Sequence, residues 1–138
     1  IQWIFPTDEP SQHNLKAPII YPLELRIFEI SDKVQQNFFR ALKMMLKFYG
    51  FDVEFNENKL IKIEKTVDFE ERLNKWAIQR NHNLLRISRI LLCMKLFGHK
   101  ELAALILGYI LGSLPKEKIE KVGYEVINIW MERAFNNK

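Results

Sequence analysis

The stretch NLLRISRILLCMKLF, residues 83–97, decides the fold of this chain. Apolar residues fill most of its positions and neither proline nor glycine interrupts it, so we predict one helix that Gly98 ends. With each residue turning the helix by about 100°, one set of four residues falls within about 60° of arc. This narrow stripe consists of His82, Arg86, Arg89 and Cys93. A helix with so little polar surface is expected at the centre of the domain.

Capping and periodicity signals predict further helices on the N-terminal side of this stretch. Ser31 is a candidate N-cap for a helix that runs to Tyr49 and that Gly50 ends. Residues 51–64 alternate and contain a turn, which is typical of a β-hairpin. Before Ser31 we expect the end of a helix at 1–6, a loop at 7–20 and a short helix from about Pro22. The apolar face predicted for the helix up to Tyr49 consists of Val34, Phe38, Ala41, Met45 and Phe48.

Similar signals follow the hairpin. Asp68 and Glu71 have the spacing of a capping box and open a helix through Trp76. Residues 100–111 form another helix, which we expect Gly112 to end, and a GxxxG pair with Gly108 indicates close helix packing. Pro115 opens the last helix. The apolar face of that helix is predicted to hold Ile119, Val122, Val126, Trp130 and Ala134.

The composition indicates one ordinary globular domain. The chain has 138 residues, 48% of them hydrophobic, which is enough for one sizeable core. We predict an all-α fold, a single compact domain of about six helices with a minor β-hairpin at 51–64. The domain spans 1–138, and its start is expected to be truncated because the chain begins with Ile1. No apolar run reaches the roughly 18 residues of a membrane span. A lone cysteine, Cys93, cannot form an internal disulfide and favours an intracellular protein, cytoplasmic or nuclear.

Positive charge is concentrated in one segment. The net charge is +4, from 21 Lys and Arg against 17 Asp and Glu. Residues 72–100 contain seven basic residues and no acidic one, which leaves 14 basic and 17 acidic residues elsewhere. Arg86 and Arg89 on a mostly buried helix need partners, because an unpaired buried charge is costly. They either pair internally, for example with Asp8 or Glu9, or bind an anion such as a phosphate or a peptide carboxylate.

Three segments of the chain, in this order, form a long pattern rich in Trp, Asn and Arg: IQWIFP (1–6), MMLKFYGF (44–51) and RLNKWAIQRNHNLLRISRIL (72–91). This pattern resembles the conserved domain of the opioid growth factor receptor family. The chain departs from the family pattern at Leu84, where the family has a second Asn, and at Tyr21 and Pro22. The match also weakens from Leu102 onward. The residues that correspond to the family signature are Gln2, Trp3, Phe5, Pro6, Phe48, Tyr49, Gly50, Trp76, His82, Asn83, Arg86, Ile87 and Arg89.

The resemblance implies an interaction domain. Animal members of the family are associated with binding an enkephalin peptide and with restraining proliferation at the nucleus, and no catalytic chemistry is attached to this domain. The resemblance by itself does not imply that this chain binds an opioid peptide. We predict a non-enzymatic module for a peptide or protein ligand, with nucleic-acid binding through the basic segment 72–100 as the alternative. The predicted ligand or anion site consists of Trp3, His82, Asn83, Arg86 and Arg89.

Metal, cofactor and nucleophile signals are weak. His13, His82 and His99 lie far apart and have no Cys or His at metal-ligand spacing, so we expect no metal site. The chain contains no phosphate-binding glycine motif, and no cofactor is expected. Cys93 shares the polar stripe with Arg89, which would lower the pKa of its thiol, but its apolar neighbours indicate burial. The sequence does not indicate the oligomeric state.

Overall fold

A computed structural model describes residues 31–57 and 59–135. The elements predicted at 1–6, at 7–20 and from Pro22, together with Trp3, lie outside the described residues. The described elements are, in order, α2 (Asp32–Tyr49), β1 (Phe51–Asn56), β2 (Lys59–Lys65), α3 (Phe69–Trp76), α4 (His82–Leu96), α5 (Lys100–Ser113), α6 (Lys116–Val122) and α7 (Tyr124–Phe135).

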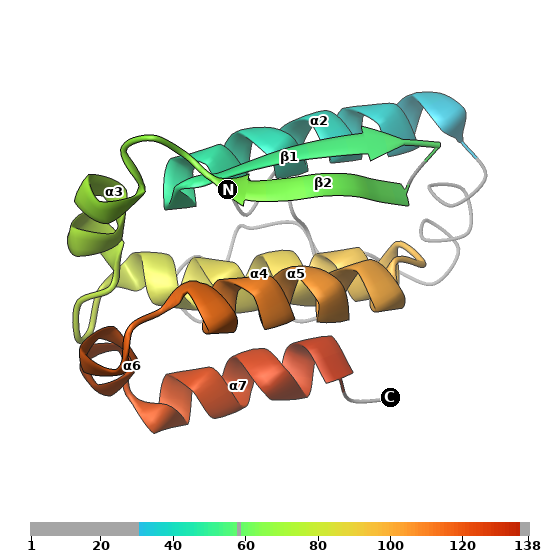
Figure 1. Ribbon diagram of the computed structural model, residues 1–138. Helices are drawn as coiled ribbons and strands as arrows, with labels where there is room; N and C mark the ends of the chain where they lie inside the picture. Colours follow the sequence, from blue (N-terminus) through green and yellow to red (C-terminus); the bar gives the residue numbers. More distant parts are fainter. Residues whose placement is uncertain (1–30, 58, 136–138) are drawn as a thin grey trace.

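These elements stack in layers (Figure 1). The long helix α2 and the hairpin form one layer, α4 and α5 form the middle, and α7 lies on the far side. The short helices α3 and α6 lie at one end of the stack. Apart from one two-stranded antiparallel sheet, the regular structure described is helical, which confirms the predicted all-α domain with a minor hairpin.

The turn between α2 and β1 depends on a glycine. Ser31 begins α2 as predicted, because its Oγ accepts a hydrogen bond from the backbone N of Val34 at 3.3 Å. Gly50 ends the helix with φ of 102°, a left-handed conformation that favours glycine. A Cβ at this position would lie 2.8 Å from Cδ1 of Phe69, so α3 packs directly onto the turn. The Gly50 carbonyl also accepts a hydrogen bond from the backbone N of Thr66 at 2.9 Å, which ties the end of β2 to the same turn.

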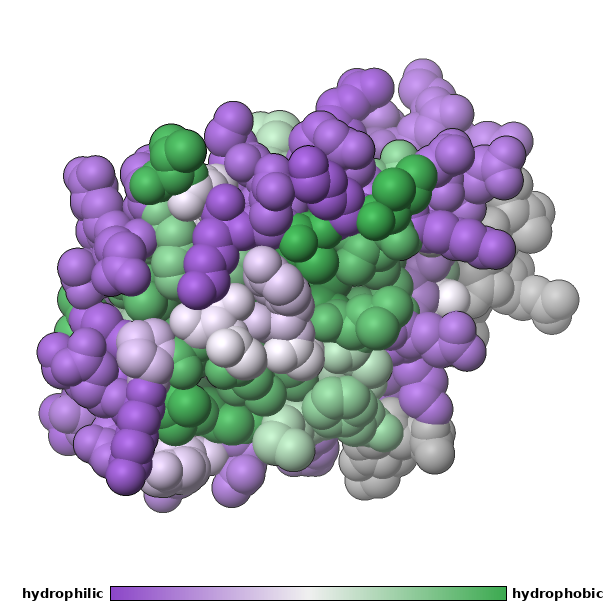
Figure 2. All heavy atoms as spheres, in the orientation of Figure 1, coloured by the Kyte–Doolittle hydropathy of each residue, from purple (hydrophilic) through white to green (hydrophobic). Residues whose placement is uncertain are grey.

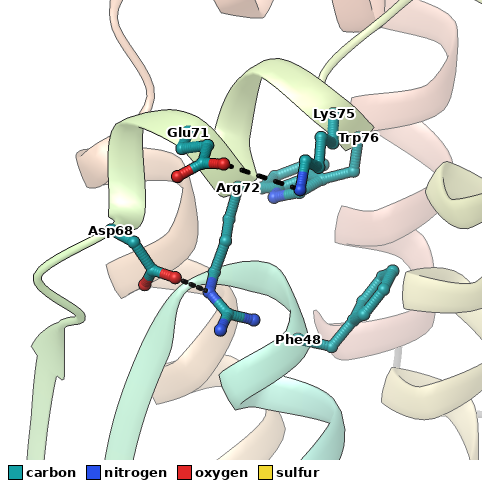
Figure 3. A pocket seen from close by; sticks show the side chains of 6 residues that line it. All are labelled: Phe48, Asp68, Glu71, Arg72, Lys75 and Trp76. Atoms are coloured by element: carbon teal, nitrogen blue, oxygen red, sulfur yellow. Dashed lines mark hydrogen bonds and ion pairs between the residues drawn. The ribbon is translucent and has the colours of Figure 1, made fainter.

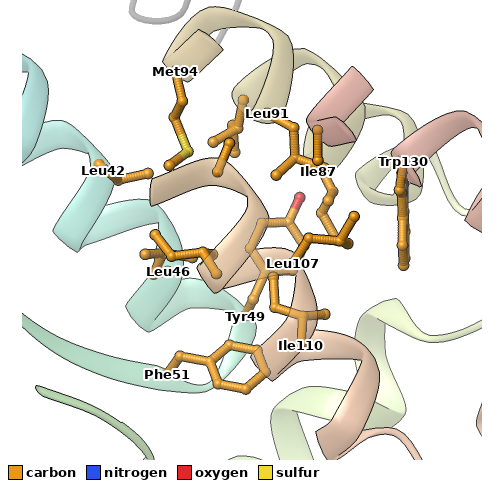
Figure 4. Close-up of a cluster of buried hydrophobic side chains, with 14 of the residues drawn as sticks. Leu42, Leu46, Tyr49, Phe51, Ile87, Leu91, Met94, Leu107, Ile110 and Trp130 are labelled. Atoms are coloured by element: carbon orange, nitrogen blue, oxygen red, sulfur yellow. The ribbon is translucent and has the colours of Figure 1, made fainter. Parts of the chain in front are cut away.

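The core lies between the layers (Figure 4). Each layer contributes large side chains that are almost completely buried. Helix α4 contributes buried residues from Leu84 to Met94, which confirms its predicted central place. The labelled core residues are Leu42, Leu46 and Tyr49 from α2, Phe51 from β1, Ile87, Leu91 and Met94 from α4, Leu107 and Ile110 from α5, and Trp130 from α7. Within the described residues, no helix is both long and apolar enough to span a membrane.

The predicted apolar face of α2 is only partly correct. Phe38 is buried, but Val34, Ala41 and Met45 are half-buried, and Phe48 is 45% exposed. The helix is rotated so that Leu42, with no exposed surface, faces the core. A helical period permits overlapping stripes, and this rotation buries larger side chains. The buried residues of α2 are Gln35, Phe38, Phe39, Leu42, Leu46 and Tyr49.

Three predicted details of the later helices are wrong. Asp68 precedes α3 but makes no capping hydrogen bond, because its carboxylate pairs with Arg72 instead. Gly112 is the second-to-last residue of α5 rather than the residue that ends it, and among the described residues no atom outside the helix backbone lies within 4 Å of a Cβ built on Gly108 or Gly112, so the GxxxG pair packs closely against none of them. The predicted last helix is two helices, broken at Gly123, where φ is 94°.

Candidate functional site

Three buried aromatic side chains meet at the N-terminal end of α4. The hydroxyl of Tyr49 donates to the backbone carbonyl of Asn83 at 2.7 Å, and Nε1 of Trp130 donates to the carbonyl of Leu84 at 2.8 Å. Nε1 of Trp76 donates to the carbonyl of Tyr49 at 3.0 Å. A buried phenol or indole needs such an acceptor, since an unsatisfied polar group in the core is costly. Helices α2 and α7 are therefore fixed to the first turn of α4, and α3 is fixed to the end of α2.

The polar side chains of this turn are engaged within the fold. The side chain of Asn81 caps α4 by accepting a hydrogen bond from the backbone N of Asn83 at 2.8 Å. Nη1 of Arg86 donates to Oδ1 of Asn83 at 3.2 Å. Burial raises the pKa of Tyr49 far above its ordinary value, and the charge of Arg86 partly offsets this. Arg86 thus lies beside the phenol, and no carboxylate in the described part of the chain forms an ion pair with it.

The structure brings together only part of the predicted site. Asn83 and Arg86 are in contact, whereas His82 is exposed at the start of α4 and Trp3 lies outside the described residues. Arg89 is half-buried with a buried Nη2, and its charge acts on Cys93.

Cys93 and His99 have structural environments. Burial raises the pKa of the fully buried Cys93 thiol to about 12, against a smaller lowering by Arg89, so the thiol stays protonated at neutral pH. His99 packs against the rings of Phe38 and Phe39, and its Nε2 lies 2.7 Å from Oε1 of Gln35. Among the residues that the structure describes, no group of three or more His, Cys, Asp or Glu side chains could hold a metal ion.

A cavity lies where the end of α2 meets α3 (Figure 3). Its volume is about 170 Å³. Arg72 spans the two helices, because its Nε lies 2.8 Å from Oδ2 of Asp68 and its Nη1 donates to the carbonyl of Lys47 at 3.0 Å. A cation at this carbonyl complements the C-terminal end of α2. The residues that line the cavity are Phe48, Asp68, Glu71, Arg72, Lys75 and Trp76.

The charges beside the cavity are paired. Nζ of Lys75 lies 3.8 Å from Oε1 of Glu71, and both side chains are exposed. The Thr66 hydroxyl and the Arg72 guanidinium hold the pKa of Asp68 below its ordinary range. Two ion pairs therefore line the same cavity as Phe48.

Sequence reasoning missed this cavity. The spacing of Asp68 with Arg72, and of Glu71 with Lys75, is the i, i+4 spacing of helical ion pairs and is a signal that the sequence contains. The capping-box interpretation of Asp68 and Glu71, together with the predicted burial of Phe48, led away from it. A single sequence contains no signal that the end of α2 lies beside α3.

Comparison with known proteins places the chain in a family. The sequence model of a family described as "Opioid growth factor receptor (OGFr) conserved region" matches residues 1–138. The human opioid growth factor receptor is 31% identical over 134 residues, which cover 95% of this chain and 19% of that protein. The rat opioid growth factor receptor-like protein 1 is 28% identical over 135 residues, which cover 94% of this chain and 28% of that protein.

The chain spans less than a third of the length of either relative. No solved structure matches it significantly. The family match covers the chain from end to end and includes Tyr49, Gly50, Trp76 and Asn83, whose packing and hydrogen bonds join α2 to α3 and to α4. The chain therefore belongs to the opioid growth factor receptor family, as its conserved region.

Proposed function

We propose that this chain is a non-enzymatic module that binds a peptide or an extended segment of a protein partner. The cavity between α2 and α3 is the observation that carries the proposal. Its volume of about 170 Å³ is below the roughly 300–1,000 Å³ of sites that enclose a whole small molecule. It is suited to one side chain of a larger partner.

The chemistry of the cavity supports such a partner. Phe48 is 45% exposed, and its ring meets that of Tyr49 edge to face at 5.2 Å, so it is held in place while it stays accessible. The neighbouring carboxylates of Asp68 and Glu71 are paired with cations, which makes them poor general bases. An aromatic anchor surrounded by paired charges is typical of a recognition surface.

The name of the human relative describes it as a receptor for opioid growth factor. A ligand-binding role for this conserved region agrees with that name, although the region is a fifth of that protein.

The nucleic-acid alternative has less support in segment 72–100. Arg72 and Lys75 already pair with carboxylates, and Arg86 donates to Asn83. These cations would have to leave their partners before they could contact phosphates.

The test is selection of random peptides displayed on phage against the folded domain, followed by affinity measurements on the selected peptide. Phe48→Ala should weaken binding by roughly tenfold or more, since truncation removes an aromatic anchor. Phe135→Ala is the matched control, because Phe135 is 46% exposed at the end of α7, away from the cavity. Failure to enrich any peptide, or equal loss in the two variants, would refute the proposed site.

A further inference from the structure

The outward side of α2 carries an unusual charge distribution. Four cations lie on it, at positions i, i+7, i+10 and i+14, and all are exposed. The only acidic residue of the helix is Asp32, in its first turn. With about 100° per residue, the exposed positions occupy roughly 140° of the helix, opposite Leu42. We call this surface the basic face: Lys33, Arg40, Lys43 and Lys47, with Met44 and Phe48 among them.

The cations of the basic face have no partners within the part of the chain that the structure describes. None of the four takes part in an ion pair there, in contrast to Arg72 and Lys75 on the adjacent α3. Arg40 and Lys43, three residues apart, repel each other on the helix surface. The face is therefore a concentrated positive surface. Figure 2 shows hydrophilic side chains along the upper edge of the molecule, where Figure 1 places α2.

Two apolar side chains interrupt these charges. Met44 is 68% exposed and Phe48 is 45% exposed, and both lie between or beside the cations along the helix. Phe48 also lines the cavity against α3, so the basic face continues into that cavity. From Lys33 to Lys47 the face extends about 21 Å along the helix axis, given a rise of about 1.5 Å per residue.

We propose that the basic face of α2 binds an acidic, amphipathic segment of the protein partner. Carboxylates of this segment pair with Arg40, Lys43 and Lys47, and an apolar side chain packs on Met44 and enters the cavity beside Phe48. The inference rests on the proposed function, since it names the chemistry of the ligand for the same cavity. Charge complementarity selects the partner, and the apolar contacts position it.

Other polyanions fit the face less well. A lipid surface would need an apolar helix side turned outward, whereas the apolar side of α2 is buried in the core. Single-stranded nucleic acid would need aromatic platforms for successive bases, and this face offers only Phe48. Met44 is the more exposed of the two apolar side chains on this face, and its thioether would not contribute to binding a phosphate backbone.

The experiment compares two charge-reversal variants in the peptide selection. Arg40→Glu/Lys43→Glu changes the basic face at mid-helix positions, where both side chains are exposed. Lys116→Glu/Lys121→Glu is the control, because it makes the same change in net charge on exposed residues of α6, which lies beyond the layer of α4 and α5 from α2. Circular dichroism melting curves verify that both variants are folded.

Peptides selected by the unmodified domain should be enriched in Asp and Glu around an apolar residue. Their affinity should fall roughly tenfold or more in Arg40→Glu/Lys43→Glu and change less than about twofold in the α6 control. The reversed face should select Lys and Arg instead. Binding should also weaken as salt increases.

Two results would overturn the inference. If peptides without acidic bias bind the domain equally well after reversal of Arg40 and Lys43, the proposed function stands and the basic face is not its ligand site. If a duplex DNA probe of random sequence binds at about 0.15 M salt and loses affinity only in the α2 variant, the face is a nucleic-acid site. Failure to enrich any peptide would refute the proposed function as well.

Discussion

Substitution of Gly50 by alanine should destabilise the domain strongly, because the new methyl group adds both a backbone-conformation cost and a steric contact. With φ at 102°, Gly50 has a left-handed backbone that costs an L-residue about 1–2 kcal/mol. The new Cβ would lie 2.8 Å from Cδ1 of Phe69, which is 4% exposed and has little room to move. Relief of such a contact in a packed core costs about 1–3 kcal/mol. The free energy of unfolding should therefore fall by about 2–5 kcal/mol.

Urea unfolding followed by circular dichroism measures this difference. Gly108→Ala is the matched control, because Gly108 lies inside α5 and, in the part of the chain that the structure describes, no atom outside the helix backbone lies within 4 Å of the position that its new Cβ would occupy. Alanine in a helix interior should raise the free energy of unfolding by about 0.5–1 kcal/mol. The reasoning fails if Gly50→Ala costs less than about 1 kcal/mol, or if the two variants change stability in the same direction.

Two further predictions concern buried groups. Trp76→Phe removes the indole that donates to the carbonyl of Tyr49 at 3.0 Å, and it should lower the free energy of unfolding by about 1–3 kcal/mol. Tyr124→Phe is the control and should leave the free energy of unfolding unchanged, because the Tyr124 side chain is 64% exposed. Equal urea midpoints for the two variants would contradict this prediction. In the folded protein the pKa of the Cys93 thiol is raised to about 12, whereas it is roughly 8.5 in the unfolded chain. As the pH rises, the thiol therefore loses its proton first in the unfolded state, and the free energy of unfolding falls above about pH 8.5. Cys93→Ala should lose less stability than the unmodified protein between about pH 8 and pH 10, and parallel pH profiles would show that the thiol is not buried as described.

The sequence predicted the helices well where a local residue determines the boundary. Ser31 and Gly50 mark the ends of α2 by their own hydrogen bonds and backbone conformation, so a single sequence contains the signal. The central place of α4 follows from its apolar composition, and its burial confirms it. Gly112 shows the limit of this reasoning, because α5 continues through this glycine to Ser113 and Gly112 has no left-handed backbone conformation.

The candidate site was less predictable. Arg86 and Asn83 carry the family motif, yet their nearest polar contacts are with each other and with the Tyr49 region, which a sequence pattern cannot distinguish from an open ligand site. Counting charge along the chain drew attention to residues 72–100 and away from α2. Pairing in three dimensions reverses that emphasis, since Arg72 and Lys75 pair with carboxylates while the cations of the basic face form no ion pair with the residues that the structure describes.

The most direct test of the account is a map of peptide binding on the domain by two-dimensional amide NMR. A selected peptide is titrated into isotope-labelled protein, and the backbone shifts are followed residue by residue. We predict that the largest changes fall on Arg40 to Phe48 and on Arg72 to Trp76, which border the basic face and the cavity. Changes centred on His82 to Arg89, with α2 unaffected, would contradict the account and restore the α4 stripe as the ligand site.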